Sequence, residues 1–289
     1  MPRFTRSLFA FLAMMVASPP ASAAPTGEEL FRAPVVLRVA GMSEVRTQTV
    51  VYAKDSAGER RADIYRPPTG SRFPAVVFIH GGFPEIPGLE GRTAGQYQSW
   101  GRLLAASGLA AVAFDHRLRV GANGAVHVDE AIADVKSVRA YLRTHATELS
   151  IDPERLCWFA VSAGGPLLTV PLNEGTAPRC LVNFYAFADV QGLGMFSRSL
   201  SPAAARKLSL VEYADRLPPI FVARAGRDTV PQMKETLDRF VARALAADAP
   251  LTLFDHATGP HAFDVLADDA RSREIITATI AFLRTHLLG

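Results

Sequence analysis

The chain has 289 residues, and 49% of them are apolar, which is enough to build the hydrophobic core of one large domain. Its 31 basic and 28 acidic residues give a net charge of +3 without a Lys/Arg-rich run, so nucleic acids and acidic membrane surfaces are disfavoured as partners. The two cysteines match no zinc or redox spacing, which argues against those classes of site.

Residues 1–23 have the pattern of a secretory signal peptide. A basic start with Arg3 and Arg6 precedes a short apolar run, and a proline pair and the small-residue sequence ASAA follow. The apolar run is about ten residues long, whereas a membrane span needs about 20. We therefore expect cleavage after Ala23, export to the periplasm or the medium, and no stable membrane association. The mature domain, residues 24–289, then carries 29 basic and 28 acidic residues and a net charge of +1.

Strand and helix patterns alternate after this leader. The first is a predicted hairpin, with strands at residues 47–54 and 61–65 around the turn Asp55-Ser56-Ala57-Gly58. Continuous apolar runs then indicate strands that are buried on both faces, at residues 75–79 and 156–161. Further strands are predicted at residues 109–114, 181–185, 220–223 and 251–254. Helical patterns lie at residues 97–107, 128–145, 232–247 and 272–287.

This alternation predicts an α/β fold with a doubly wound, mostly parallel sheet. Ligands of such sheets bind beyond the carboxyl ends of the strands, so we look for functional residues there. Residues 187–216 are the least regular part of the chain, and we interpret them as a small lid insert.

The turn at Ser162 is the strongest local signal. The segment Ala160-Val161-Ser162-Ala163-Gly164-Gly165 follows a predicted buried strand, and Pro166 can begin a helix after it. A serine on a sharp turn between strand and helix exposes its hydroxyl, and small neighbours are needed because other backbone passes close by. The pattern predicts a nucleophile, although on its own it is equally typical of a tight turn capped by serine.

Three other polar segments also follow predicted strands. In His80-Gly81-Gly82-Phe83 the paired glycines allow backbone amides to point into a cavity. Asp228 lies in a turn where an acid can orient a histidine, and His261 lies in a Gly/Pro turn that reaches across the top of the sheet. Because every one of these segments follows a strand, we expect them to converge on one edge of the sheet.

Other acids and histidines fit these roles less well. The competing acids lack the combination of a preceding apolar strand and a following Val-Pro turn; they are Asp189, Asp215 and Asp255. His256 is the main competitor of His261 but lies nearer the end of its strand. His80 belongs to the glycine loop, and we expect it to brace that loop by hydrogen bonds rather than act as a base.

Neither a metal site nor a disulfide is required by the sequence. Asp115-His116-Arg117, taken with His127 and Asp129, matches no ligand spacing, so we expect no metal. Cys157 and Cys180 both lie in apolar, strand-like segments. A disulfide and two buried thiols both fit, and we favour thiols because neighbouring strands often hold cysteines at a geometry that is awkward for bridging.

Taken together, these segments resemble the α/β-hydrolases over residues 47–288. The Ser162 turn resembles the nucleophile elbow G-x-S-x-G, with Ala160 in place of the first glycine, and the His80 loop resembles the HGGG-type oxyanion loop, with Phe83 in place of the third glycine. The chain order Ser, Asp, His is that of the family. The resemblance implies a catalytic triad and an oxyanion hole: the triad is Ser162, Asp228 and His261, and the hole is formed by the amides of Gly82, Phe83 and Ala163.

The resemblance is strongest to exported carboxylesterases and polysaccharide-deacylating esterases, and to catalytic domains of prolyl-oligopeptidase-like peptidases. It implies hydrolysis of small-molecule or carbohydrate esters through an acyl-enzyme, without a cofactor. Two alternatives stay open. Such peptidases usually carry a large additional domain, for which we expect no room here, and a binding protein can retain a hydrolase fold without activity.

Overall fold

The computed structural model describes residues 27–56, 58–82, 90–120, 125–174 and 177–289. The predicted signal peptide, residues 1–23, lies outside the described residues, and so does Phe83 of the predicted oxyanion loop. In the part of the chain that the structure describes, no helix has both the length and the apolar character needed to cross a membrane.

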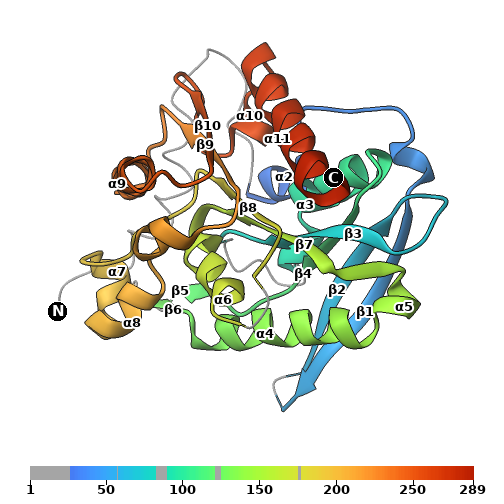
Figure 1. Cartoon of the computed structure of the whole chain (residues 1–289), viewed down its shortest axis with the longest axis horizontal. Helices are drawn as coiled ribbons and strands as arrows, with labels where there is room; N and C mark the ends of the chain where they lie inside the picture. The colour runs from blue at the N-terminus through green and yellow to red at the C-terminus, as the bar shows by residue number, and fades with distance from the viewer. Residues whose placement is uncertain (1–26, 57, 83–89, 121–124, 175–176) are drawn as a thin grey trace.

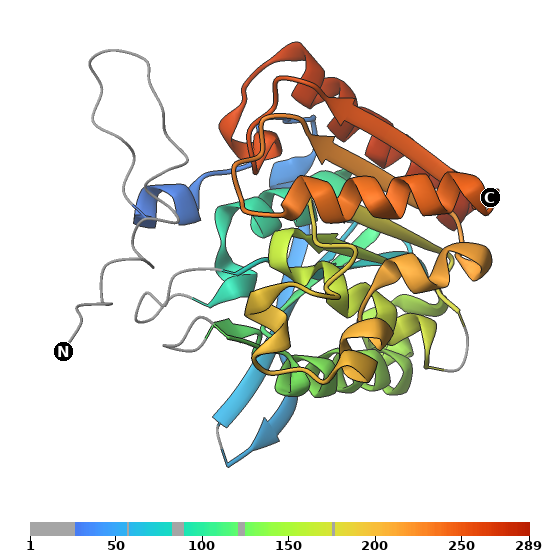
Figure 2. The same ribbon diagram turned by 90° about the vertical axis from the view of Figure 1, so that its left-hand side faces the viewer.

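An eight-stranded sheet forms the centre of the molecule, in the order β1-β2-β4-β3-β7-β8-β9-β10 (Figure 1). The strands are β1 (Arg46–Asp55), β2 (Gly58–Arg66), β3 (Phe73–Ile79), β4 (Ala110–Phe114), β7 (Ile151–Val161), β8 (Cys180–Phe184), β9 (Ile220–Ala225) and β10 (Leu251–His256). The hairpin β1–β2 is antiparallel and β2 pairs antiparallel with β4, whereas all the other neighbours are parallel. The arrowheads of β9 and β10 point the same way in Figure 2. The predicted mostly parallel sheet is confirmed.

Helices cover both faces of this sheet, as the predicted alternation requires (Figure 1). The long helices are α3 (Gly95–Ala106), α4 (Asp129–Thr144), α9 (Met233–Ala246) and α11 (Ala270–Leu288). Helices α4 and α9 pack on one face with Trp158, and α3 and α11 pack on the other with Phe159. These two neighbours in β7 enter opposite cores because successive side chains of a strand alternate between faces.

Short elements are present that the sequence patterns did not predict, because they are much shorter than the window of about 11 residues over which a periodic pattern can be recognised. They are α2 (Gly27–Arg32), η1 (Met42–Glu44), η2 (Gly91–Thr93), the hairpin β5 (Arg119–Val120) and β6 (Val126–His127), α5 (Ala146–Leu149) and α10 (Phe263–Leu266). The helix expected at Pro166 is present, but it begins earlier, at Ser162, and in the 3₁₀ form. Pro166 lies inside the 3₁₀ segment η3 (Ser162–Leu168), and only the single turn α6 (Thr169–Leu172) follows.

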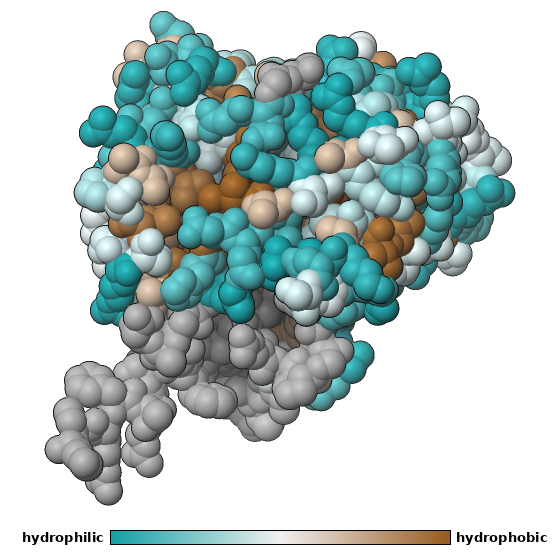
Figure 3. Space-filling view, turned by 90° about the horizontal axis from the view of Figure 1, so that it is seen from below, coloured by the Kyte–Doolittle hydropathy of each residue, from teal (hydrophilic) through white to brown (hydrophobic). Residues whose placement is uncertain are grey.

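The predicted insert, residues 187–216, folds into three short helices: α7 (Gly194–Ser197), α8 (Pro202–Lys207) and η4 (Leu210–Arg216). Its apolar side chains form a separate small core with Val126 and Val128 near β6 and with Met233 at the start of α9. Figure 3 shows apolar side chains at the surface on the left-hand side, where Figure 1 places α7 and α8. The insert is joined to the Ser162 turn at its first residue, where the Phe187 amide donates a hydrogen bond to the Ser162 carbonyl oxygen at 3.1 Å.

Both cysteines are buried free thiols, in agreement with the favoured interpretation. Cys157 in β7 lies opposite Cys180 in β8 in the parallel register, and neither side chain is exposed. Burial raises the pKa of the Cys157 thiol well above its usual value, so this thiol stays protonated.

We predict that Phe240→Ala on α9 lowers the free energy of unfolding by about 3–5 kcal/mol, since Phe240 is fully buried in the core and its removal leaves a cavity. Leu245→Ala on the same helix is the control: Leu245 is 61% exposed, and we expect a change within about 0.5 kcal/mol. Urea unfolding followed by circular dichroism measures both changes. Equal effects of the two variants would contradict the packing of α9 against the sheet.

Candidate active site

Ser162 occupies a strained turn at the carboxyl end of β7. Its φ is +53°, a left-handed conformation that costs a residue with a side chain about 1–3 kcal/mol. The two glycines that follow permit this turn. A methyl group on Gly164 would come within 2.6 Å of the His80 carbonyl oxygen, and one on Gly165 within 2.1 Å of the Phe187 carbonyl oxygen. The small residues of the motif are therefore needed for close backbone contact.

The structure brings Ser162, His261 and Asp228 together in one hydrogen-bonded row. The His261 Nδ1 atom lies 2.7 Å from Asp228 Oδ2, and its Nε2 atom lies 2.9 Å from Ser162 Oγ. Because an ionised carboxylate only accepts hydrogen bonds, Nδ1 carries the proton and Nε2 is left to accept the serine hydroxyl. The side chains of His261 and Asp228 are 8% and 1% exposed, so water competes little for these bonds.

Two adjacent parallel strands hold the acid and the histidine in this row. Asp228 follows β9 and His261 follows β10, and these strands pair in register along their whole length. Backbone hydrogen bonds also join the two turns, from the Gly226 amide to the His256 carbonyl and from the Arg227 amide to the Gly259 carbonyl, both at 2.9 Å. The second carboxylate oxygen of Asp228 accepts the Val230 amide at 2.8 Å, which fixes the carboxylate plane.

The glycine loop after β3 lies against the Ser162 turn. A methyl group on Gly81 would be 3.0 Å from the Cβ of Ser162, and one on Gly82 would be 3.7 Å from the Cβ of Ala163. The Gly81 amide donates to the hydroxyl of Tyr97 in α3 at 3.0 Å. Two of the predicted oxyanion-hole residues, Gly82 and Ala163, are therefore neighbours.

His80 supports this loop by hydrogen bonds and ring stacking. Its Nδ1 donates to the Gly81 carbonyl at 2.8 Å, and its Nε2 accepts the His116 amide at 3.4 Å. The two imidazole rings stack with centroids 3.5 Å apart. Burial lowers the pKa of His80 to about 4 and the pKa of His116 well below its ordinary value. Both rings are therefore neutral at pH 7, which agrees with a bracing role.

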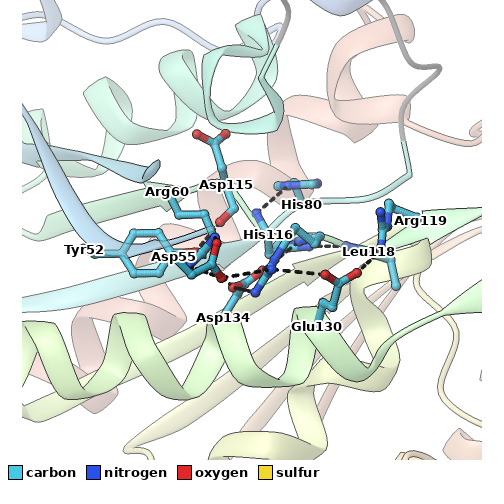
Figure 4. Close-up of polar contacts among 11 residues, drawn as sticks. Tyr52, Asp55, Arg60, His80, Asp115, His116, Leu118, Arg119, Glu130 and Asp134 are labelled. Atoms are coloured by element: carbon cyan, nitrogen blue, oxygen red, sulfur yellow. Dashed lines mark hydrogen bonds and ion pairs between the residues drawn. The ribbon is translucent and has the colours of Figure 1, made fainter. Parts of the chain in front are cut away.

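A buried ion-pair network anchors the segment that carries His116 (Figure 4). Asp134 of α4 is 1% exposed and binds Arg60 Nε at 3.1 Å and Arg117 Nη2 at 2.8 Å. The Tyr52 hydroxyl donates to the Asp115 carbonyl at 2.5 Å. These bonds hold the chain beyond β4, and with it the His116 ring that packs on His80.

The competing acids and histidine have other partners, and each acid pairs with an arginine. The pairs are Asp189 with Arg239, Asp255 with Arg224, and Asp215 with Arg243. The His256 Nε2 lies 3.2 Å from Asp269 and 3.1 Å from the Ser272 hydroxyl, so this histidine binds side chains at the start of α11. Among the described residues, no group of three or more His, Cys, Asp or Glu side chains is arranged to hold a metal ion.

Sequence reasoning missed three residues that surround the site: Tyr97, Tyr185 and Asp264. The Tyr185 ring meets the His261 ring edge-on, with centroids 4.8 Å apart, and the Tyr185 hydroxyl binds Asp264 at 2.5 Å. Tyr185 comes at the end of a predicted strand, and Asp264 is close to His261 in sequence. Their pairing joins residues 79 positions apart, and no local pattern signals it.

Comparison with known proteins identifies the fold. A family model described as BD-FAE matches residues 62–174, a range that includes both the glycine loop and the Ser162 turn. No curated protein matches the sequence.

Solved structures match over most of the chain. A thermophilic esterase from Thermogutta terrifontis, with butyrate bound, is 22% identical with a TM-score of 0.65 and covers 84% of this chain and 95% of its own. A bacterial heroin esterase is 18% identical with a TM-score of 0.67 and covers 87% of each chain. An esterase from the archaeon Pyrobaculum calidifontis is 19% identical with a TM-score of 0.64 and covers 84% of this chain and 88% of its own. The chain has the α/β-hydrolase fold.

We predict that the protein loses stability as the pH falls from about 6.5 to 4. His80 is neutral in the folded state down to a pKa of about 4, whereas in the unfolded chain it takes up a proton near pH 6.5. The unfolded state therefore binds more protons in this window, and His80 alone accounts for a loss of about 3 kcal/mol across it. Urea unfolding between pH 4.5 and 7.5 measures this slope.

His80→Asn keeps a donor toward Gly81 but does not titrate, so its stability should fall less steeply with pH than that of the wild type. His127→Gln changes an exposed histidine and serves as the matched control, with an unchanged slope. If the free energy of unfolding of His80→Asn fell with pH as steeply as that of the wild type, the His80 ring would not be a buried neutral group.

Proposed function

We propose that the protein is a serine hydrolase that cleaves carboxylic esters through an acyl-enzyme intermediate. The observation that carries this proposal is the hydrogen-bonded row from Ser162 Oγ through the His261 imidazole to the Asp228 carboxylate. A strained serine, an oriented histidine and a buried acid, at the carboxyl edge of a parallel sheet, are the parts that nucleophilic catalysis requires. The matched solved structures are named as esterases, which supports ester hydrolysis.

In the proposed reaction His261 Nε2 takes the hydroxyl proton as Ser162 Oγ attacks the ester carbonyl carbon. Asp228 remains ionised, holds the imidazole in the required tautomer and stabilises its protonated form. The tetrahedral intermediate collapses, the alcohol leaves with the proton from His261, and an acyl-serine remains. Water then attacks the acyl group by the same route and releases the carboxylic acid.

We propose that backbone amides of Gly82, Phe83 and Ala163 stabilise the negative oxygen of the tetrahedral intermediate. The contact between the glycine loop and the Ser162 turn supports this role for Gly82 and Ala163. One such donor is worth about 3–4 kcal/mol of transition-state stabilisation. His80 and Tyr97 hold this loop by hydrogen bonds, and in the proposal they keep the amides in place before substrate binds.

The proposed substrates are small-molecule or carbohydrate esters, and the reaction needs no cofactor. We further propose that the protein acts outside the cytoplasm, on the basis of the signal-peptide pattern in residues 1–23. Neither nucleic acid nor membrane lipid is a proposed partner, because the mature sequence carries almost no net charge.

We predict that Ser162→Ala lowers kcat for p-nitrophenyl acetate by about 10⁴- to 10⁶-fold, because it removes the nucleophile. Asp228→Asn should lower kcat by about 10⁴-fold, because the neutral amide no longer stabilises the required tautomer. Ser197→Ala, at an exposed serine on α7, is the control and should leave kcat unchanged. The assay compares initial rates at equal concentrations of folded protein.

Two further measurements separate this function from others. A fluorophosphonate probe should label the wild-type protein, and peptide mapping should place the label on Ser162; a binding protein without an activated serine would not react. Aminoacyl p-nitroanilides should be poor substrates beside p-nitrophenyl esters. Labelling at another serine, or full activity in Ser162→Ala, would refute the proposed function.

A further inference from the structure

A buried carboxylate is linked to the proposed catalytic histidine through Tyr185, and no step of the proposed reaction uses it. Asp264 of α10 has no exposed surface. Three side chains from distant parts of the chain converge on it. The Tyr185 hydroxyl lies 2.5 Å from Oδ1, and Gln96 Nε2 and Trp100 Nε1 lie 2.9 Å and 2.8 Å from Oδ2. Burying a carboxyl group without water is unfavourable unless such bonds compensate for the lost hydration.

The partners of Asp264 fit its ionised form. Trp100 and Gln96 reach the carboxylate with N–H groups, which only donate. Gln96 Nε2 also lies 2.8 Å from the Tyr185 hydroxyl oxygen, so this hydroxyl accepts from Gln96 and its own proton is free to bind Asp264. Burial raises the pKa of the Asp264 carboxyl above its ordinary value, and the hydrogen bonds from these three donors oppose that rise without cancelling it.

The Asp264 carboxylate is joined to His261 by two routes. Through space, it holds the hydroxyl of Tyr185, whose ring packs edge-on against the imidazole. Along the chain, it lies three residues after His261, on the far side of Ala262. Both linking residues are strained, with φ of +37° at Tyr185 and +57° at Ala262, which are left-handed values that residues with side chains rarely adopt.

A strained turn persists only where several contacts with the surrounding structure hold it in place. Here α3 supplies Gln96 and Trp100, and the segment after α2 adds a further hydrogen bond, from the Val36 amide to the Asp264 carbonyl at 2.8 Å. Asp264 therefore fixes at one point the turn after β8 and the turn after β10. The turn after β10 carries His261, and the turn after β8 carries the Tyr185 ring that packs against it.

We propose that Asp264 is a positioning residue for His261, acting through Tyr185 and the strained Ala262 turn to aim Nε2 at Ser162 and Nδ1 at Asp228. This inference rests on the proposed ester hydrolysis and adds to it a second buried carboxylate, which touches neither substrate nor reacting atoms. Its effect is on the rate of proton transfer rather than on substrate binding.

The first test is Asp264→Asn, which preserves the side-chain shape and one acceptor oxygen but replaces the other with a donor. We expect kcat for p-nitrophenyl acetate to fall about 10- to 100-fold, as small misplacements of a catalytic group do, with KM changed less than twofold. Asp269→Asn is the matched control. Asp269 is an acid that caps α11 and binds His256, so its loss should affect stability and leave kcat unchanged.

Tyr185→Phe keeps the ring against His261 and removes only the hydroxyl. This variant provides the test if Asp264→Asn does not fold. We expect a fall in kcat of about 3- to 10-fold, again without a change in KM. The double variant should be no slower than Asp264→Asn alone, because both changes cut the same link and their effects are then not additive. Full additivity, or normal kcat in both single variants, would overturn the inference.

A proton NMR measurement reads the position of His261 without any turnover. The Nδ1 proton shared with Asp228 should give a strongly downfield resonance in the wild type, in Ser162→Ala and in Asp269→Asn, and a broadened or missing one in Asp264→Asn. An inactive wild type with this pattern would refute the proposed function and leave the positioning role standing. An active wild type, with a sharp resonance and normal kcat in folded Asp264→Asn, would refute the positioning role alone.

Discussion

The close backbone contact around Ser162 is the constraint on which the rest of the structure depends. Gly164 packs against the backbone of β3, and Gly165 packs against the start of the insert, so neither position accepts a side chain without displacing its neighbour. The same contact brings the glycine loop to Ser162 and forces this serine into a left-handed turn. The surrounding strands compensate for that strain, and the hydroxyl is held where the imidazole of His261 can reach it.

The long elements and the meeting of the site residues could be predicted from the sequence, and the reason is physical. Buried parallel strands have apolar runs, so β3, β4, β7, β8 and β9 are visible as local patterns, whereas β10 is a part-exposed edge strand with a shorter apolar signal. Parallel strands end at a common edge, so residues such as Ser162, Asp228 and His261 that follow different strands could be expected to meet. Both inferences need only local sequence and the rules of sheet geometry.

What the sequence did not predict depends on contacts between distant segments. The stacking of His80 on His116 and the bond between Tyr185 and Asp264 join residues from separate elements, and neither residue type signals such a partner. The short helices of residues 187–216 are too brief for a periodic pattern, and their small core depends on contacts with distant segments such as β6, α4 and α9. The helix expected at Pro166 is present as a 3₁₀ segment that begins at Ser162 and leads into the single turn α6.

The buried thiols of Cys157 and Cys180 can report how often the sheet opens in the native protein. Both thiols lie in the middle of the sheet, in adjacent parallel strands, with no accessible surface, and burial keeps Cys157 protonated. An alkylating reagent reaches them only when β7 separates from β8 or the helices leave the sheet. The rate of thiol modification in the native protein therefore measures the frequency of these openings, without any engineered label.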